Sequence, residues 1–245
     1  MRRLGAPIVL AGCIALTAPA IATAQESDVI GGQATTIEEW PHQVAIAQPV
    51  EPGRDGYDRQ FCGGSLVSDD AVLTAAHCVS DGNGKFFQPA DQNVISGRTT
   101  LSTTEGVESV VTNIFYFVDD GVTITPQSVL EAQSPAEDQL WNPDTNRWDV
   151  AILELGTAAV APAAPITIAG PSEGSLWDPG DQVFATGWGE QTAFGAGDYP
   201  DRMREVELEM KTDGDCGDAL SYGSEFDPVT MVCAGTPTAA GPGDT

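Results

Sequence analysis

The sequence contains few basic residues and few histidines. Its 245 residues include 10 lysines and arginines against 36 aspartates and glutamates, which gives a formal net charge of −26. Nucleic-acid-binding proteins neutralise phosphates with a basic surface, so this balance excludes a nucleic-acid partner. The excess of acid favours solubility and can attract basic ligands. Only two histidines occur, at positions 42 and 77, so a histidine-based site has few candidates.

Long apolar runs are also missing beyond the first residues of the chain. No stretch of about 18 uninterrupted apolar residues occurs there, so a spanning helix is not expected. The N-terminus has a different pattern, because Arg2 and Arg3 precede an apolar segment that ends in Ala22-Thr23-Ala24. Pro7 and Pro19 interrupt that segment, which disfavours a membrane anchor. The pattern predicts a cleaved signal peptide over residues 1–24 and a secreted, extracellular protein.

An alternative interpretation of the N-terminal segment depends on Cys13. Residues 10–13, Leu-Ala-Gly-Cys, resemble the lipidation box of bacterial lipoproteins. Cleavage before Cys13 would leave a lipidated N-terminus on a membrane surface. The apolar run continues past Cys13, which favours the later cleavage site. We therefore expect no membrane partner unless Cys13 is lipidated.

The chain has five cysteines and no Cys-x-x-Cys pair. Removal of Cys13 with the signal peptide leaves an even number in an exported chain, which predicts disulfides. These cysteines are Cys62, Cys78, Cys216 and Cys233. The sequence alone allows three connectivities. Without closely paired cysteines a metal site is not expected, and no metal or cofactor is predicted.

Short runs rich in Val, Ile and Thr lie between turn residues, including 27 glycines and 17 prolines. This composition predicts an all-β fold, and a hydrophobic content of 41% is enough for one or two packed domains. Strands are expected over residues 40–47, 61–67, 71–75 and 204–210, with further strand-like runs between 94 and 118. Residues 204–210 alternate strictly, as a half-exposed strand does.

Three motifs carry candidate chemistry. Residues 72–78, Val-Leu-Thr-Ala-Ala-His-Cys, place His77 beside a cysteine, and residues 61–67, Phe-Cys-Gly-Gly-Ser-Leu-Val, supply a second cysteine upstream. Residues 149–153, Asp-Val-Ala-Ile-Leu, place Asp149 at the head of an apolar strand. A histidine and an acid brought together by the fold are typical of a general base and its orienting carboxylate. In this order, and with Ala-Thr-Gly-Trp-Gly at 185–189, the motifs resemble the trypsin-like (chymotrypsin-fold) serine proteases over residues 29 to 245.

The resemblance implies an all-β fold of two antiparallel six-stranded β-barrels, the second incomplete in this chain. It divides the chain into the signal peptide (1–24), a short pro-segment (25–28), an N-terminal barrel (29–157) and a connector with the incomplete C-terminal barrel (158–245). It selects the disulfide pairs Cys62–Cys78 and Cys216–Cys233. It gives His42 a structural role.

The resemblance also implies a secreted serine endopeptidase that acts on proteins or peptides and is open to protein protease inhibitors. His77 and Asp149 are the implied catalytic base and acid. Asp244 falls where trypsin-like members carry the acid that binds Arg or Lys of the substrate. Val29-Ile-Gly-Gly resembles the mature N-terminus that activation of a zymogen releases. Asp28 precedes it instead of the usual Arg or Lys, so the activating protease stays open.

The nucleophile is missing from the sequence. The family has a Gly-Asp-Ser-Gly-Gly run after the Cys-Ala-Gly segment, and no Gly-Asp-Ser-Gly occurs up to Thr245. We expect the serine to lie beyond Thr245 and this fragment to be inactive. The alternative is a non-catalytic protease homologue that acts as a protein-binding module. Retention of both His77 and Asp149 favours the enzyme, because a binding module has no need of them.

Two further segments lie close to the proposed chemistry or carry acidic residues. Residues 119–148 are longer than the family usually has at this place and are expected to form a surface loop close to the catalytic acid. Such a loop either shapes substrate access or is merely solvated, and we favour the solvated loop. Glu105 and Glu108 lie in a loop that binds calcium in some relatives. Two carboxylates are too few for an ion that takes six to eight oxygens, so no calcium site is predicted.

Overall fold

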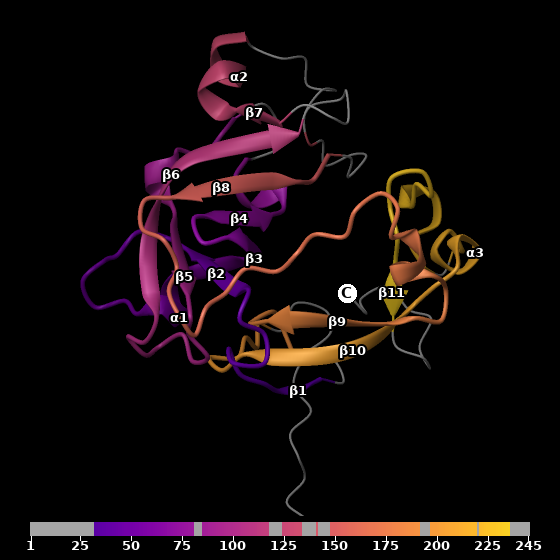
Figure 1. Ribbon diagram of the computed structural model, residues 1–245, viewed down its shortest axis with the longest axis horizontal. Coiled ribbons are helices and arrows are strands. Elements are labelled where there is room, and N and C mark those ends of the chain that lie inside the picture. Colours follow the sequence, from indigo (N-terminus) through magenta and orange to yellow (C-terminus); the bar gives the residue numbers. More distant parts are fainter. Residues whose placement is uncertain are drawn as a thin grey trace, which may run out of the picture.

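The computed structural model describes residues 32–80, 85–117, 124–133, 141, 148–191, 197–219 and 221–235. The signal peptide, the pro-segment, Val29 and Asp244 lie outside these residues. Most regular structure in the described chain is β-strand, arranged in two sheets (Figure 1). None of the helices in this part of the chain has the length and apolar character that crossing a membrane requires.

The first sheet closes on itself. Its strands run in the order β5-β2-β3-β4-β8-β6, and β5 also pairs with β6, so the six strands form a closed antiparallel barrel. They are β2 (Gln43–Ala47), β3 (Gln60–Ser68), β4 (Ala71–Thr74), β5 (Asn93–Ser96), β6 (Val107–Phe117) and β8 (Ala151–Leu155). The short strand β7 (Ile124–Pro126) extends the sheet beyond β6. The helical segments α1 (Gly56–Arg59) and η2 (Pro89–Asp91) lie in its connections. The strands expected at 61–67, at 71–75 and between 94 and 118 are thereby confirmed, whereas the strand expected over 40–47 begins at Gln43, after a turn.

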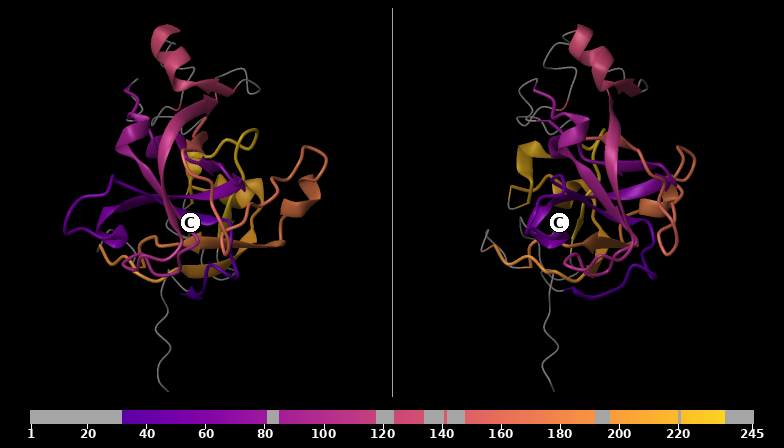
Figure 2. Two further views of the ribbon diagram at one scale, coloured as in Figure 1. Left: turned by 60° about the vertical axis from the view of Figure 1, so that its left-hand side comes forward. Right: turned by 90° about the vertical axis from the view of Figure 1, so that its left-hand side faces the viewer.

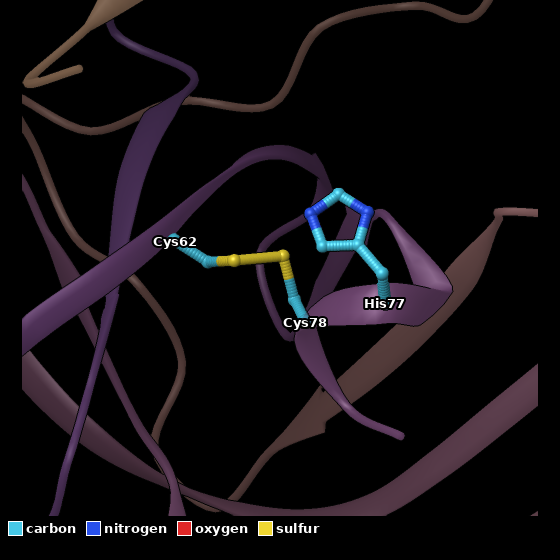
Figure 3. A group of neighbouring side chains, drawn as sticks. All are labelled: Cys62, His77 and Cys78. Carbon is cyan, nitrogen blue, oxygen red and sulfur yellow. A yellow bond between two sulfur atoms is a disulfide. The ribbon is translucent and has the colours of Figure 1, made fainter. Parts of the chain in front are cut away.

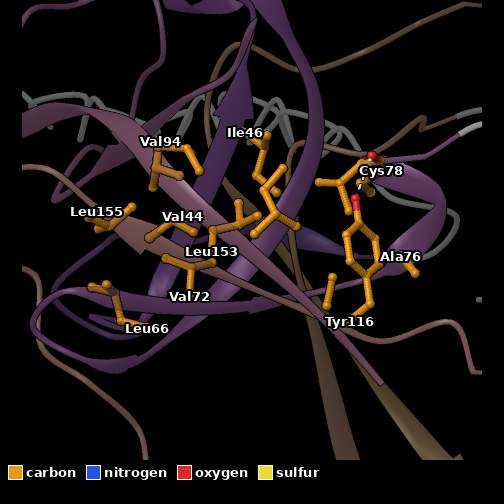
Figure 4. Packing of buried hydrophobic residues seen from close by; sticks show 14 of the residues in the cluster. Val44, Ile46, Leu66, Val72, Ala76, Cys78, Val94, Tyr116, Leu153 and Leu155 are labelled. Carbon is orange, nitrogen blue, oxygen red and sulfur yellow. Dashed lines mark hydrogen bonds between the residues drawn. The ribbon is translucent and has the colours of Figure 1, made fainter. Parts of the chain in front are cut away.

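The barrel encloses a core of inward-facing apolar side chains (Figure 4). The core includes Val44, Ile46, Leu66, Val72, Val94, Ile114, Tyr116, Leu153 and Leu155. Glycine is required at one point of the Cys-Gly-Gly motif, where a Cβ on Gly64 would lie 2.7 Å from Val72 Cγ1 and 2.8 Å from the carbonyl oxygen of Leu73. The motif therefore allows β3 and β4 to approach closely.

The second sheet is built around β10 (Arg204–Met210). It pairs antiparallel with β9 (Gln182–Gly187) on one side and with β1 (Gln33–Ala34) and β11 (Ala234–Gly235) on the other. Every second residue of β10 is buried, as its alternating sequence predicts. In its described part this sheet is open. Short helical turns η4 (Gly174–Trp177), α3 (Asp213–Cys216) and η5 (Gly223–Glu225) lie in its connections.

A second apolar cluster joins the barrel to this sheet. Its buried members are Ile37, Ala45, Ala47, Ile95, Leu101, Trp188 and Met203. Strand β2 is buried on both faces, because its Val44 and Ile46 point into the barrel while Ala45 and Ala47 belong to this cluster. The Trp188 indole donates a hydrogen bond to the Thr99 carbonyl at 3.2 Å. The tryptophan of the Ala-Thr-Gly-Trp-Gly run therefore links the second sheet to the barrel by packing and by a hydrogen bond.

Residues 119–148 contain more structure than a solvated loop. Besides β7 they include α2 (Gln127–Gln133), which lies at the end of the barrel away from β9 and β10 in all three views (Figures 1 and 2). Leu130 is only 2% exposed and packs in the barrel core. The expectation of a purely solvated segment is therefore wrong for this helix. A helix of seven residues is too short for its apolar period to be read from sequence.

Candidate active site

The register of two paired strands brings His77 and Asp149 together. Strands β4 and β8 are antiparallel, and Thr74, the last residue of β4, lies opposite Ala151, the first of β8. The chain leaves β4 into a single turn of 3-10 helix, η1 (Ala76–Cys78), which carries His77. Asp149 comes just before β8. Both side chains therefore emerge at the same end of the barrel, where loops commonly present functional groups.

Asp149 holds His77 through both of its carboxylate oxygens. Oδ2 lies 2.8 Å from Nδ1 of the His77 ring, and Oδ1 accepts the backbone N–H of His77 at 2.8 Å. Two contacts from one carboxylate fix both the ring and its backbone. They also favour the tautomer that carries its proton on Nδ1, so that Nε2 is left as the proton acceptor.

This contact governs the electrostatics of His77. The hydrogen bond to Asp149 raises the pKa of the imidazole above its ordinary value, with partial burial opposing and the negative charge of Asp149 reinforcing the shift. The ring is nevertheless accessible, since 52% of the His77 side chain is exposed. An accessible imidazole held by a carboxylate can take a proton from a neighbouring hydroxyl and then share its positive charge with the acid.

Covalent and hydrogen bonds brace the segment that carries His77. Cys78 is joined to Cys62 on β3, with a Cα–Cα distance of 6.1 Å, and the bridge lies beside the imidazole ring (Figure 3). On the other side, the Tyr116 hydroxyl donates to the Val79 carbonyl at 2.8 Å from inside the core. The turn around His77 is thus anchored to β3 and to β6.

The disulfide and His77 also lie close enough together to be examined as a possible metal site. One ligand atom each from Cys62, His77 and Cys78 lies within 4.8 Å of the others. Both sulfurs are bonded to each other in the disulfide, so neither is a thiolate that could ligate a metal ion. The second pair, Cys216 and Cys233, is also joined, with a Cα–Cα distance of 6.2 Å. The four cysteines are paired as the resemblance implied.

Comparison with known proteins gives the family of the chain. The sequence model of the family described as Trypsin matches residues 29–245. The chain belongs to the trypsin family. It is 32% identical over 209 residues to a trypsin of Saccharopolyspora erythraea, covering 85% of this chain and 74% of the relative. It is also 28% identical to granzyme-like protein 1 of Rattus norvegicus, covering 91% of this chain and 75% of the relative.

Solved structures show the same fold. A structure of GrC matches with a TM-score of 0.61 at 23% identity, covering 84% of this chain and 75% of that chain. Neuropsin, described as a serine protease expressed in the limbic system of mouse brain, matches with a TM-score of 0.60 at 22% identity, covering 84% and 74%. This chain is thus a trypsin-like serine protease by family and has the two-barrel fold, with proteins or peptides as the expected class of substrate.

One neighbour of His77 in this trypsin-family chain was missed by sequence reasoning. Trp141 lies in the inserted segment, and its ring centroid is 5.8 Å from that of His77 with the planes tilted by 54°. Trp141 also packs against the barrel core. The only available signal was its position eight residues before Asp149, which says nothing about the direction of its side chain.

The remaining candidate residues take other places in the structure. His42 forms an edge-on ring contact with Trp40, at 6.1 Å, and burial lowers its pKa. Glu108 turns both carboxylate oxygens to the guanidinium of Arg59, at 2.7 and 2.9 Å, and also accepts from Asn93. The Glu108 carboxylate is thus paired with the buried guanidinium of Arg59. Asp244 lies outside the described residues.

Proposed function

We propose that the chain is the front part of a secreted endopeptidase that cuts peptide bonds after Arg or Lys. In this proposal His77 is the general base, Asp149 orients it, and a serine is the nucleophile. The observation that carries the proposal is the double contact of Asp149 with the ring and the backbone of His77. Membership of the trypsin family supports the same reaction class.

The proposed steps follow from the positions of the two ring nitrogens. Nδ1 donates to Asp149, so Nε2 accepts the serine proton as the hydroxyl attacks the scissile carbonyl carbon. The imidazolium that forms is stabilised by the Asp149 carboxylate. His77 then returns the proton to the nitrogen of the leaving amine as the peptide bond breaks. Water repeats the attack on the acyl-enzyme and restores the serine.

The proposal takes the serine from sequence that follows Thr245. No Gly-Asp-Ser-Gly run occurs before that residue. Among the described serines, Ser65 is a β3 residue paired opposite Leu73, and Ser224 belongs to the turn η5. Within the described part of the chain, His77 has no hydrogen bond to a serine. A chain that stops at Thr245 is accordingly proposed to be inactive.

Specificity and processing are proposed from the sequence. Asp244 would pair with the Arg or Lys side chain of the substrate at the base of the primary pocket. The segment 1–24 would be removed on export and 25–28 on activation, leaving residues 29–157 as the first barrel and 158–245 as the connector and part of the second. Mass spectrometry of the mature N-terminus tests the processing. A start at Gln25 or Val29 agrees with it, and a lipidated Cys13 contradicts it.

The first experiment for this function is to sequence the gene beyond the codon for Thr245. A Gly-Asp-Ser-Gly-Gly run there, and cleavage by the complete product of peptides with Arg or Lys before the cut, are the expected results. Preference for Phe or Ala in the same peptide series would refute the role of Asp244. A stop codon, or another residue in place of the serine, would favour the protein-binding homologue instead.

A further inference from the structure

The inserted segment that precedes Asp149 contributes one aromatic side chain to the surroundings of His77. The Trp141 ring centroid lies 5.8 Å from that of the imidazole, with the two planes tilted by 54°. Asp149 contacts Nδ1 of the imidazole, and the Cys62–Cys78 disulfide lies beside the ring (Figure 3). Within the described residues, no other aromatic ring contacts that of His77. The carboxylate, the disulfide and the indole thus lie around the candidate base.

Packing holds the Trp141 indole in this place. The side chain is partly buried and packs against the barrel core, whose members include Ala76 and Cys78, the two neighbours of His77 in η1. The indole N–H is buried, and among the described residues nothing accepts a hydrogen bond from it. A buried donor without a partner is destabilising, so hydrogen bonding does not account for a tryptophan here. Trp141 therefore offers His77 a large aromatic surface.

An aromatic surface favours the protonated form of an imidazole beside it. The quadrupole of the ring attracts a cation within about 6 Å of the ring centroid, and Trp attracts it most strongly. Asp149 is the charged group that acts on His77 in the described part of the chain, and the neighbouring sulfurs are disulfide-bonded and do not titrate. The carboxylate and the indole therefore stabilise the same form of His77, the imidazolium.

We propose that Trp141 is a positioning residue of the active site, whose indole holds the His77 ring against Asp149 and stabilises the imidazolium formed in each proton transfer. Trp141 acts through His77 and touches neither the nucleophile nor the scissile bond. The imidazolium forms when the serine attacks and again when water attacks, so its stabilisation accelerates both steps. This role in catalysis rests on the proposed function, whereas the effect of Trp141 on the protonation of His77 does not.

The protonation of His77 tests the contact without catalysis. W141L removes the ring and keeps an apolar side chain, whereas W141F keeps an aromatic face. W141M, whose flexible side chain fills irregular gaps, takes the place of W141L if that variant does not fold. The matched control is W177L, at a tryptophan of η4 that is 37% exposed. D69N, on the exposed turn between β3 and β4, controls for the loss of a surface carboxylate.

NMR titration of the imidazole C–H signals compares the unaltered chain with these variants. A cation–π contact of ordinary strength predicts that the pKa of His77 falls by about half a unit in W141L or W141M. The fall should be smaller in W141F and absent in W177L and D69N, and the pKa of His42 should stay unchanged throughout. An unchanged pKa of His77 without the ring, or an equal fall in W141F and W141L, would overturn the proposal.

A second readout separates this proposal from the protease itself. The complete gene product is labelled with a fluorophosphonate over a range of pH. We expect labelling to be about two- to fivefold slower in W141L, with partial recovery in W141F and with the midpoint of the pH profile moved to lower pH. Equal labelling of W141L and the unaltered product at every pH refutes the role of Trp141 and leaves the protease. An NMR shift in W141L without labelling of any serine in the unaltered product keeps the contact with His77 and refutes the protease.

Discussion

Nδ1 of His77 and Oδ2 of Asp149 lie 2.8 Å apart although 72 positions separate the two residues. The pairing of β4 with β8 sets this distance, since it aligns the end of one strand with the start of the other. A shift of one residue in that register would turn every β8 side chain to the opposite face of the barrel. The buried Leu153 and Leu155 resist such a shift, so the barrel core also protects the geometry of the site.

We expect the two histidines to titrate on opposite sides of the ordinary value of 6.5. The hydrogen bond to Asp149 raises the pKa of His77, and burial lowers that of His42. NMR titration of the two imidazole C–H signals measures both. In D149N the pKa of His77 should fall while that of His42 stays unchanged. A His77 signal that titrates below 6.5 in the unaltered chain would contradict the contact.

The raised pKa of His77 also makes stability depend on pH. Its folded pKa exceeds its unfolded value, so the contribution is fully present below the unfolded pKa of about 6.5 and is lost as pH rises through the folded pKa. D149N should remove this part of the pH dependence in urea unfolding. The side chain is half exposed, so the change is expected to be small.

We expect the ion pair between the buried Arg59 and the half-buried Glu108 to be costly to break. Burial opposes ionisation of Glu108, yet hydrogen bonds from Arg59 and Asn93 hold its pKa below the ordinary value. E108Q leaves the buried Arg59 guanidinium without its countercharge, which should cost about 3 kcal/mol in the free energy of unfolding. E51Q, in the exposed pair with Arg54, is the matched control and should cost less than about 1 kcal/mol.

The Arg59–Glu108 pair should also make the free energy of unfolding depend on pH in the acid range. Because the folded pKa of Glu108 is depressed, its contribution is present above the unfolded pKa and is lost as pH falls through the folded pKa. Urea melts between neutral pH and pH about 3 should therefore converge for the unaltered chain and E108Q. A constant difference across this range would contradict the ion pair.

We expect the inserted helix α2 to contribute to stability through Leu130. L130A removes a side chain that is 2% exposed in the barrel core, and such truncations cost about 2–5 kcal/mol. The neighbouring Val129 is 39% exposed, so V129A should change the free energy of unfolding by about 0.5 kcal/mol or less. Equal effects of the two substitutions, measured by urea unfolding, would show that the helix does not dock on the barrel.

Sequence reasoning reached the fold through motifs and alternation. The alternating 204–210 predicts β10, and the histidine, cysteine and aspartate motifs predict that His77 and Asp149 meet. Burial of β2 on both faces could not be predicted from the sequence. The residues that cover its second face, such as Trp188 and Met203, come from the far half of the chain.

Contacts between distant segments account for the other differences. In the sequence Glu108 stands close to Glu105, in a loop that binds calcium in some relatives, but its partner Arg59 lies 49 positions away and no local pattern links the two. Trp141 reaches His77 from an insertion whose sequence shows no period. The motifs identify residues that do chemistry, whereas the residues packed around them depend on the tertiary structure.

The most direct test of the central claim, that His77 and Asp149 activate a serine, is covalent labelling of the complete gene product with a fluorophosphonate. The account predicts one labelled serine, located by peptide mass spectrometry beyond residue 245. It predicts labelling slowed by about 10⁴-fold in D149N, lost in H77A and unchanged in the control D69N. Absence of labelling, or labelling that is as fast in H77A as in the unaltered protein, would contradict the claim.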